Sequence, residues 1–273
     1  MQSIVFLILF VSGIGTMLGG FLCCYVKQTH KNFAIGLSFF AGIMIYMSLA
    51  DVLKKAEHIF LKLYSQNVTN WFITLLFCIS LFLVVLIDIF LNKINKKIVS
   101  TDKQITFAEI NKTELIKVIL FSLISITLHN IPEGLYVYIV SGDNLKIFYS
   151  IILPMILHNI MEGLAIAFPI YYLVGDKCMV AICSFLCGIC EICGLLFITL
   201  LSKTIINYHI FCFLVIFSSV MMLYIAFNKM IFLARKYGND EIVFRGIFIG
   251  ILFMMIITNI TPNITSIFLQ LYQ

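Results

Sequence analysis

Two neighbouring apolar segments of the sequence carry nearly the same polar phrase, HNIPEGL at 129–135 and HNIMEGL at 158–164. Each phrase places a histidine, an amide and a carboxylate within a stretch that is otherwise apolar. An ionisable group at the centre of a membrane helix costs about 2.5–3.5 kcal/mol, so such groups mark a functional site in a membrane segment. The repeated phrase is therefore where chemistry is expected.

The spacing within each phrase indicates a metal site. Residues i and i+4 share one face of a helix, so His129 projects together with Glu133, and the second phrase repeats this arrangement. A short loop joins the two segments, which are expected to lie antiparallel, with Gly134 and Gly163 letting their backbones approach. Imidazole and carboxylate together suit Zn²⁺, Fe²⁺ and other first-row ions better than Ca²⁺ or Mg²⁺. The candidate metal ligands are His129, Asn130, Glu133, His158, Asn159, Glu162 and, in a later apolar segment, Glu191.

A purely structural role for these polar residues is less favoured than metal binding. Hydrogen bonding between helices explains a single buried polar residue well, but it explains six at repeated spacing poorly. The thiols of Cys187, Cys190 and Cys193 surround Glu191 in the sequence and could add soft ligands. Cysteine in an apolar helix is more often a small hydrophobic residue, and this is the interpretation we favour.

The composition indicates what must position these groups. Apolar residues make up 62% of the 273 residues and charged residues 11%, whereas soluble domains contain about 25% charged residues. This excludes a soluble globular protein and predicts an all-α, polytopic membrane protein. Apolar runs of spanning length predict eight transmembrane helices, near residues 4–26, 33–53, 71–91, 115–140, 147–174, 179–201, 208–234 and 244–270.

Lysine and arginine residues in the connections predict the orientation. Alternate connections hold thirteen of them on one side and five on the other, and the richer side is expected to be cytosolic, which leaves both termini on the non-cytosolic side. The predicted divisions are transmembrane helices one to three at 1–91, a cytosolic basic loop at 92–114, metal-binding helices four and five at 115–174, and helices six to eight at 175–273. The loop contains neither histidine nor cysteine.

A weaker internal repeat relates the second and seventh spans. AGIMIYMS at 41–48 matches SVMMLYIA at 219–226, which pairs Tyr46 with Tyr224. The two spans run in opposite directions, as the halves of an inverted repeat do. Chance similarity between apolar helices remains an alternative.

The two HN-x-x-EG phrases resemble the fourth and fifth transmembrane signatures of the ZIP (Zrt/Irt-like) metal transporters, most closely those of the bacterial-type zinc-uptake branch. AGIMIYMSLADVL at 41–53 and LCGICEICG at 186–194 are similar to that branch as well. The resemblance implies the ZIP fold, with eight helices in a 3+2+3 arrangement and an inverted repeat, and it suggests homodimers. It also implies an elevator in which helices one, four, five and six move against the rest.

The resemblance further implies a binuclear metal site between helices four, five and six, with bridging glutamates. The first metal would be held by His129, Glu133, His158 and Glu162. The second would be held by Asn130, Glu133, Asn159, Glu162 and Glu191.

Two residues depart from the pattern of that branch. Met161 stands where the branch has proline, so helix five is expected to kink less there. Lys229 in helix seven stands where relatives often have an acidic residue, and its charge would repel cations if it faced their pathway.

The sequence therefore predicts a transporter, not an enzyme, that moves Zn²⁺ or Fe²⁺ into the cytosol, with Mn²⁺ also fitting the ligands. No prosthetic group is expected. The expected partners are metal ions and the lipid bilayer, without nucleic acid, and the plasma membrane is favoured over an organelle membrane. An intramembrane metal-dependent enzyme acting on lipid is an alternative, although the chain has five histidines and no His-Glu-x-x-His motif. A metal-binding receptor without flux is another.

Overall fold

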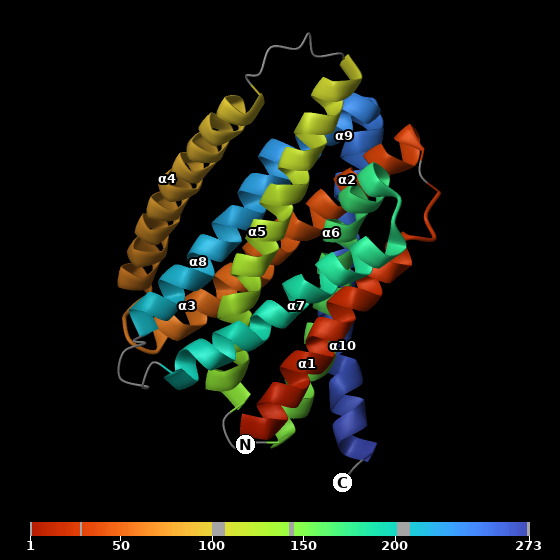
Figure 1. Cartoon of the computed structure of the whole chain (residues 1–273). Helices are drawn as coiled ribbons and strands as arrows, with labels where there is room; N and C mark the ends of the chain where they lie inside the picture. The colour runs from red at the N-terminus through yellow and green to blue at the C-terminus, as the bar shows by residue number, and fades with distance from the viewer. Residues whose placement is uncertain (1, 28, 100–106, 142–144, 201–207, 272–273) are drawn as a thin grey trace.

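The computed structural model describes residues 2–27, 29–99, 107–141, 145–200 and 208–271, and within these ranges every regular element is a helix (Figure 1). The elements in chain order are α1 (Gln2–Cys23), α2 (His30–Tyr46), η1 (Met47–Val52), α3 (Leu53–Leu61), α4 (Gln66–Val99), α5 (Phe107–Ser141), α6 (Leu145–Val174), α7 (Lys177–Leu200), α8 (Tyr208–Ile225), η2 (Ala226–Ile231), α9 (Phe232–Tyr237) and α10 (Asp240–Leu271).

The helices follow the predicted spans in order and differ from them at the ends. Each predicted span falls on one helix or on consecutive ones, α2–η1–α3 for the second span and α8–η2–α9 for the seventh. In the described part of the chain, six helical stretches are long and apolar enough to cross a membrane, and α1 contributes a shorter apolar helix at Leu9–Cys23. The chain is thus an all-helical, multi-pass membrane protein.

The polar segment at 92–114 contains more helix than the term loop suggests. The helix α4 continues to Val99 and α5 already begins at Phe107, so only residues 100–106 lie outside the described backbone. The segment contains neither proline nor glycine, the two residues that most disfavour a helix interior. The division of the chain at 1–91, 92–114, 115–174 and 175–273 stays a prediction.

Glycines bring α1, α5, α6 and α7 into close contact, and we call these four helices the glycine-packed block. A Cβ atom on Gly134 of α5 would collide with the backbone carbonyl of Glu191 in α7. A Cβ atom on Gly163 of α6 would collide with the carbonyl of Thr16 in α1. The prediction that these glycines bring α5 and α6 together was therefore wrong about the partners, because each glycine faces a different helix of the block.

The other helices form the second part of the bundle. The helix α10 packs along α2, α4 lies at the edge of the bundle against α8, and α8 also contacts α5 of the glycine-packed block (Figure 1). Residues of α2, α6, α8 and η2 share one buried apolar cluster.

Two π-helical turns of six residues fall at matched places in the two weakly repeated spans. The turn η1 begins directly after Tyr46, and η2 begins two residues after Tyr224. The backbone carbonyl of Ser48 in η1 accepts a hydrogen bond of 2.9 Å from Ser219 Oγ in α8. Turns of this kind are rare and occur mostly as single bulges, frequently at functional sites.

A partly buried ion pair joins α4 to η2. Lys229 Nζ lies 2.7 Å from Asp88 Oδ1, and the Tyr224 hydroxyl donates a hydrogen bond of 2.6 Å to Asp88 Oδ2. The same ammonium group lies 4.6 Å from the centre of the Phe121 ring in α5. A carboxylate thus compensates the positive charge that would otherwise repel cations.

Removing one member of this pair should destabilise the protein. Asp88→Asn and Lys229→Met each leave the other charge largely buried and without its ionic partner, for which we expect a loss of about 1–3 kcal/mol in the free energy of unfolding. The double variant removes both charges and should recover most of that loss. Thermal unfolding of the purified proteins in detergent measures the difference, and a double variant as unstable as either single variant would contradict the expectation.

Candidate metal centre

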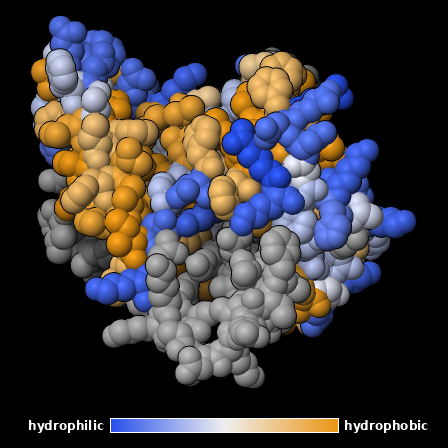
Figure 2. Space-filling view, turned by 90° about the horizontal axis from the view of Figure 1, so that it is seen from above, coloured by the Kyte–Doolittle hydropathy of each residue, from blue (hydrophilic) through white to orange (hydrophobic). Residues whose placement is uncertain are grey.

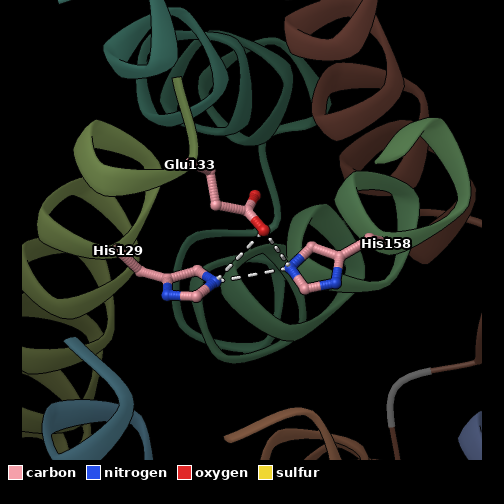
Figure 3. A group of neighbouring side chains, drawn as sticks. All are labelled: His129, Glu133 and His158. Carbon is pink, nitrogen blue, oxygen red and sulfur yellow. Dashed lines mark hydrogen bonds and ion pairs between the residues drawn. The ribbon is translucent and has the colours of Figure 1, made fainter. Parts of the chain in front are cut away.

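The histidine and glutamate side chains of the two phrases converge between α5 and α6. His129 Nε2 and His158 Nε2 lie 3.4 Å apart. Glu162 Oε1 lies 3.4 Å from His129 Nε2 and 3.1 Å from His158 Nε2. Glu133 Oε1 lies 3.8 Å and 3.4 Å from the same two nitrogens. Figure 3 shows His129 and Glu133 of α5 and His158 of α6 pointing toward one another.

Regular helix geometry produces this convergence. On each helix the histidine and glutamate are four residues apart and share a face. Pro132 in α5 and Pro154 and Pro169 in α6 lie inside continuous helices, so the prolines do not take the ligands off the regular spacing. The site is thus built on rigid elements rather than on loops, which favours a fixed ligand geometry.

The ligand distances suit a zinc ion. Atoms that bind a tetrahedral Zn²⁺ at about 2.0–2.1 Å are separated from one another by about 3.3–3.4 Å. The nitrogen–nitrogen and nitrogen–oxygen distances here range from 3.1 to 3.8 Å. Imidazoles that bind a metal are neutral and the carboxylates are ionised, so a divalent cation would cancel the two negative charges of the four ligands. Compensation is needed because His129 and Glu162 are only 1% and 2% exposed.

A second group of buried oxygen atoms adjoins the first through Glu162. Within the described residues, no hydrogen bond reaches four of these atoms, namely Asn130 Oδ1, Asn159 Oδ1, Glu162 Oε2 and Glu191 Oε2. The amide nitrogens are occupied, because Asn130 Nδ2 donates to the carbonyl of Cys187 at 2.8 Å and Asn159 Nδ2 donates to Glu191 Oε1. Buried polar atoms are normally satisfied, so an oxygen set of this kind suits a second cation.

The thiols near Glu191 make other contacts. Cys187 Sγ lies 3.6 Å from Thr127 Oγ1, and Cys190 Sγ donates a hydrogen bond to the Leu186 carbonyl at 3.2 Å. Cys193 is exposed on the surface of α7. The close ligand group drawn in Figure 3 contains no cysteine among the described residues. These contacts favour the interpretation of the three cysteines as small hydrophobic residues.

Two serines contact the site although nothing in the sequence indicates that they do. Ser218 Oγ in α8 lies 3.4 Å from His129 Nδ1, where it can fix the orientation of the ring. Ser12 Oγ in α1 accepts a hydrogen bond of 2.5 Å from Asn159 Nδ2. A serine in an apolar helix resembles a small packing residue, and both helices are distant from the phrases in the chain, so only tertiary packing reveals these contacts.

Comparison with known proteins identifies relatives along most of the chain, although no family model matches it. The chain is 31% identical over 259 residues to a protein of Streptococcus mutans named zinc transporter ZupT, covering 92% of this chain and 95% of the relative. It is 32% identical over 270 residues to a protein of that name from Akkermansia muciniphila, covering 93% and 96%. A protein of that name from Clostridium perfringens is 27% identical over 266 residues, covering 92% and 93%.

The glycine contacts predict a graded response to substitution by alanine. Gly163→Ala and Gly134→Ala each place a Cβ atom against a backbone carbonyl that cannot rotate away, so we expect large losses of stability, at or above the usual 1–3 kcal/mol for overpacking. Gly13→Ala is the matched control, because its Cβ would lie 3.2 Å from the carbonyl carbon of Gly188 and needs only a small shift. Thermal unfolding in detergent ranks the three variants, and equal losses in all three would contradict a cause in close backbone contact.

Proposed function

Because this chain belongs to the family of the ZupT zinc transporters, the bacterial branch of the ZIP transporters, we propose that it carries Zn²⁺ across the membrane into the cytosol. His129, Glu133, His158 and Glu162 are the proposed ligands. The observation that carries the proposal is the convergence of two imidazole nitrogens and two carboxylate oxygens at distances that suit a tetrahedral zinc ion. Fe²⁺ and Mn²⁺ accept similar ligands and are the ions to test in competition.

We extend this site to two metal ions. The second ion would be bound by oxygen atoms of Asn130, Asn159 and Glu191, with Glu133 and Glu162 bridging the two ions. The buried oxygens of both asparagines, and one oxygen each of Glu162 and Glu191, support this extension because no described residue satisfies them with a hydrogen bond.

We propose eight membrane crossings, in the 3+2+3 arrangement with an inverted repeat. The eight single or composite helices support the number. The repeat is supported by the matched π turns and by the opposite directions of α2 and α8 in Figure 1. The first residues of α1 and the last residues of α10 lie at the same end of the bundle, as an even number of crossings requires.

We propose that the end of the molecule at which α9 lies is cytosolic. Figure 2 looks onto this end, where hydrophilic side chains are spread among hydrophobic ones. The exposed basic residues of the helix ends and turns that meet here are Lys27, Lys31, Lys177, Arg235, Lys236 and Arg245. An excess of lysine and arginine is typical of the cytosolic side. Both termini would then lie on the other side of the membrane.

The plasma membrane is the proposed location, since the relatives named above come from bacteria. Homodimers stay a prediction.

Neutralisation of charge supplies the proposed means of moving the ion. A hydrated Zn²⁺ exchanges its water for the four ligands, and its two charges cancel those of Glu133 and Glu162. The neutral complex costs much less to enclose in a medium of low dielectric constant than either the bare ion or the bare site. When water re-enters from the cytosolic side, the ion leaves to ligands in the cell.

An aromatic cluster on the cytosolic side of the site is the proposed closed gate. Phe168 and Tyr172 follow Glu162 along α6, and the Phe33 ring of α2 stacks on the Tyr172 ring at 3.8 Å between centroids. The Tyr172 hydroxyl bonds His30 Nδ1 at 2.7 Å. His30 also stacks on Tyr237 of α9, at 5.4 Å. These contacts link the glycine-packed block to α2 and α9, so movement of the block against the rest would have to separate them.

Zinc flux into proteoliposomes tests the proposed function. Glu133→Gln and Glu162→Gln remove a charge that the ion must balance, and each should reduce Zn²⁺ uptake at least tenfold. Glu241→Gln is the matched control, because Glu241 is an exposed carboxylate paired with Arg245 in α10, and it should transport as the wild type does. If the wild type binds Zn²⁺ but does not transport it, the result would favour the receptor alternative and contradict the proposed transport function.

Cross-linking tests the gate. A short, reducible, bifunctional thiol reagent should bridge His30→Cys to Tyr172→Cys across the two parts of the molecule, and it should abolish Zn²⁺ uptake until reduction restores it. The control pair, His30→Cys with Tyr237→Cys, lies within one part and should keep its uptake when bridged. Wild-type protein, which has nine native cysteines, reports the effect of the reagent alone. If the His30→Cys/Tyr172→Cys protein is fully cross-linked and still takes up Zn²⁺ at its uncross-linked rate, the proposed gate is wrong.

A further inference from the structure

Ser12 is a fully buried serine of α1 whose hydroxyl lies between two of the proposed ligands of the second ion. Its Oγ accepts a hydrogen bond of 2.5 Å from Asn159 Nδ2 and donates one of 3.4 Å to Glu191 Oε1. The residue lies outside both repeated phrases, on a helix that contributes no side chain to the set of candidate ligands.

The two copies of the phrase hold their asparagines by different means. Asn130 Nδ2 donates to the backbone carbonyl of Cys187, which is present whatever side chain stands at that position. Asn159 Nδ2 donates to Ser12 Oγ and to Glu191 Oε1, which both belong to side chains. The orientation of Asn159 therefore depends on the residue at position 12, whereas the orientation of Asn130 does not.

Orientation matters because the two ends of an amide have opposite polarity. The oxygen can bind a cation, whereas the NH₂ group is a donor and cannot. With both hydrogens of Asn159 engaged by Ser12 and Glu191, the amide oxygen is turned away from them and is left without a hydrogen bond from any described residue. Hydrogen bonds from Ser12 and Asn159 also occupy Oε1 of Glu191, and its Oε2 is left without a hydrogen bond from any described residue.

We propose that Ser12 is a positioning residue of the second metal site, whose hydroxyl holds Asn159 and Glu191 so that Asn159 Oδ1 and Glu191 Oε2 face a divalent cation. This role rests on the proposed binuclear site. It makes α1 one of the helices that line the second metal site.

Close helix packing explains how a short side chain of α1 contacts residues of both α6 and α7. Gly13, next to Ser12, lies against the backbone of Gly188, and Gly163 lies against the carbonyl of Thr16. Both contacts bring the backbone of α1 close enough to α6 and α7 for a side chain as short as serine to touch both.

Calorimetric titration of the purified full-length protein with Zn²⁺ tests this role. The wild type should bind about two equivalents. Ser12→Ala should weaken the second equivalent by about 10–100-fold, the usual effect of removing a residue that orients a metal ligand, and leave the first unchanged. Ser12→Thr keeps the hydroxyl and should bind both equivalents with the affinity of the wild type. Ser184→Ala is the matched control, because Ser184 is an equally buried serine of α7 whose hydroxyl bonds no described residue.

The outcomes separate this role from the proposed function and from a loss of fold. Two equivalents within twofold of wild-type affinity in Ser12→Ala would overturn the role of Ser12, as would an equal weakening in Ser184→Ala. If Ser12→Ala has a lower melting temperature than the wild type, two further variants distinguish a local effect on the second site from a general loss of fold. These are Glu191→Gln and the double variant Ser12→Ala/Glu191→Gln. The double variant should bind as Glu191→Gln does, and a further loss at the first equivalent would overturn the proposal. A wild type that binds fewer than two equivalents would refute the binuclear site itself.

Discussion

The structure depends on one electrostatic constraint, the burial of Glu133 and Glu162 against two imidazoles inside an apolar bundle. Carboxylates in such surroundings need a positive partner. A lysine or arginine would satisfy them permanently, as Lys229 satisfies Asp88 elsewhere in the molecule. A histidine ring nitrogen can instead bind a cation together with the carboxylate, so in the proposed site a mobile ion supplies the balancing charge. The two carboxylate environments therefore differ in kind, and the difference distinguishes the structural ion pair of Asp88 from the proposed metal site.

The packing of the helices follows from this constraint. Ligands on α5 and α6 can share an ion only if the helices are held in fixed register, and glycines provide this through contacts with backbone carbonyls of α7 and α1. Each phrase therefore carries its glycine for a reason of its own, apart from the metal. In the proposed site the glutamate of each phrase binds the ion, and the glycine after it packs against a neighbouring helix. The aromatic contacts of Tyr172 and Phe33 then connect this block to the remaining helices.

Much of this arrangement could be predicted from the sequence, because the informative signals are local. Spans follow from apolar runs, and the pairing of His129 with Glu133 follows from helical periodicity. Beyond the pairing of the two helices that carry the phrases, the particular residue contacts between helices could not be predicted. The partners of Gly134 and Gly163, the bond between Ser12 and Asn159, and the compensation of Lys229 by Asp88 all join distant parts of the chain. In a membrane helix, serine and glycine look alike whether they pack against lipid, a backbone or a ligand.

The π turn η2 has a consequence for how mutations in the seventh span are interpreted. An α-helix advances by about 100° per residue, and a turn that accommodates one extra residue shifts every later position by about that angle. Residues after Ala226 therefore face directions that a helical wheel drawn from Tyr208 assigns to their neighbours. Lys229 reaches Asp88 within this displaced register. A scanning mutagenesis profile of this span should change phase near residue 226. A single-residue deletion within the turn should convert it to regular α-helix and leave the later residues on the sides that they occupy now.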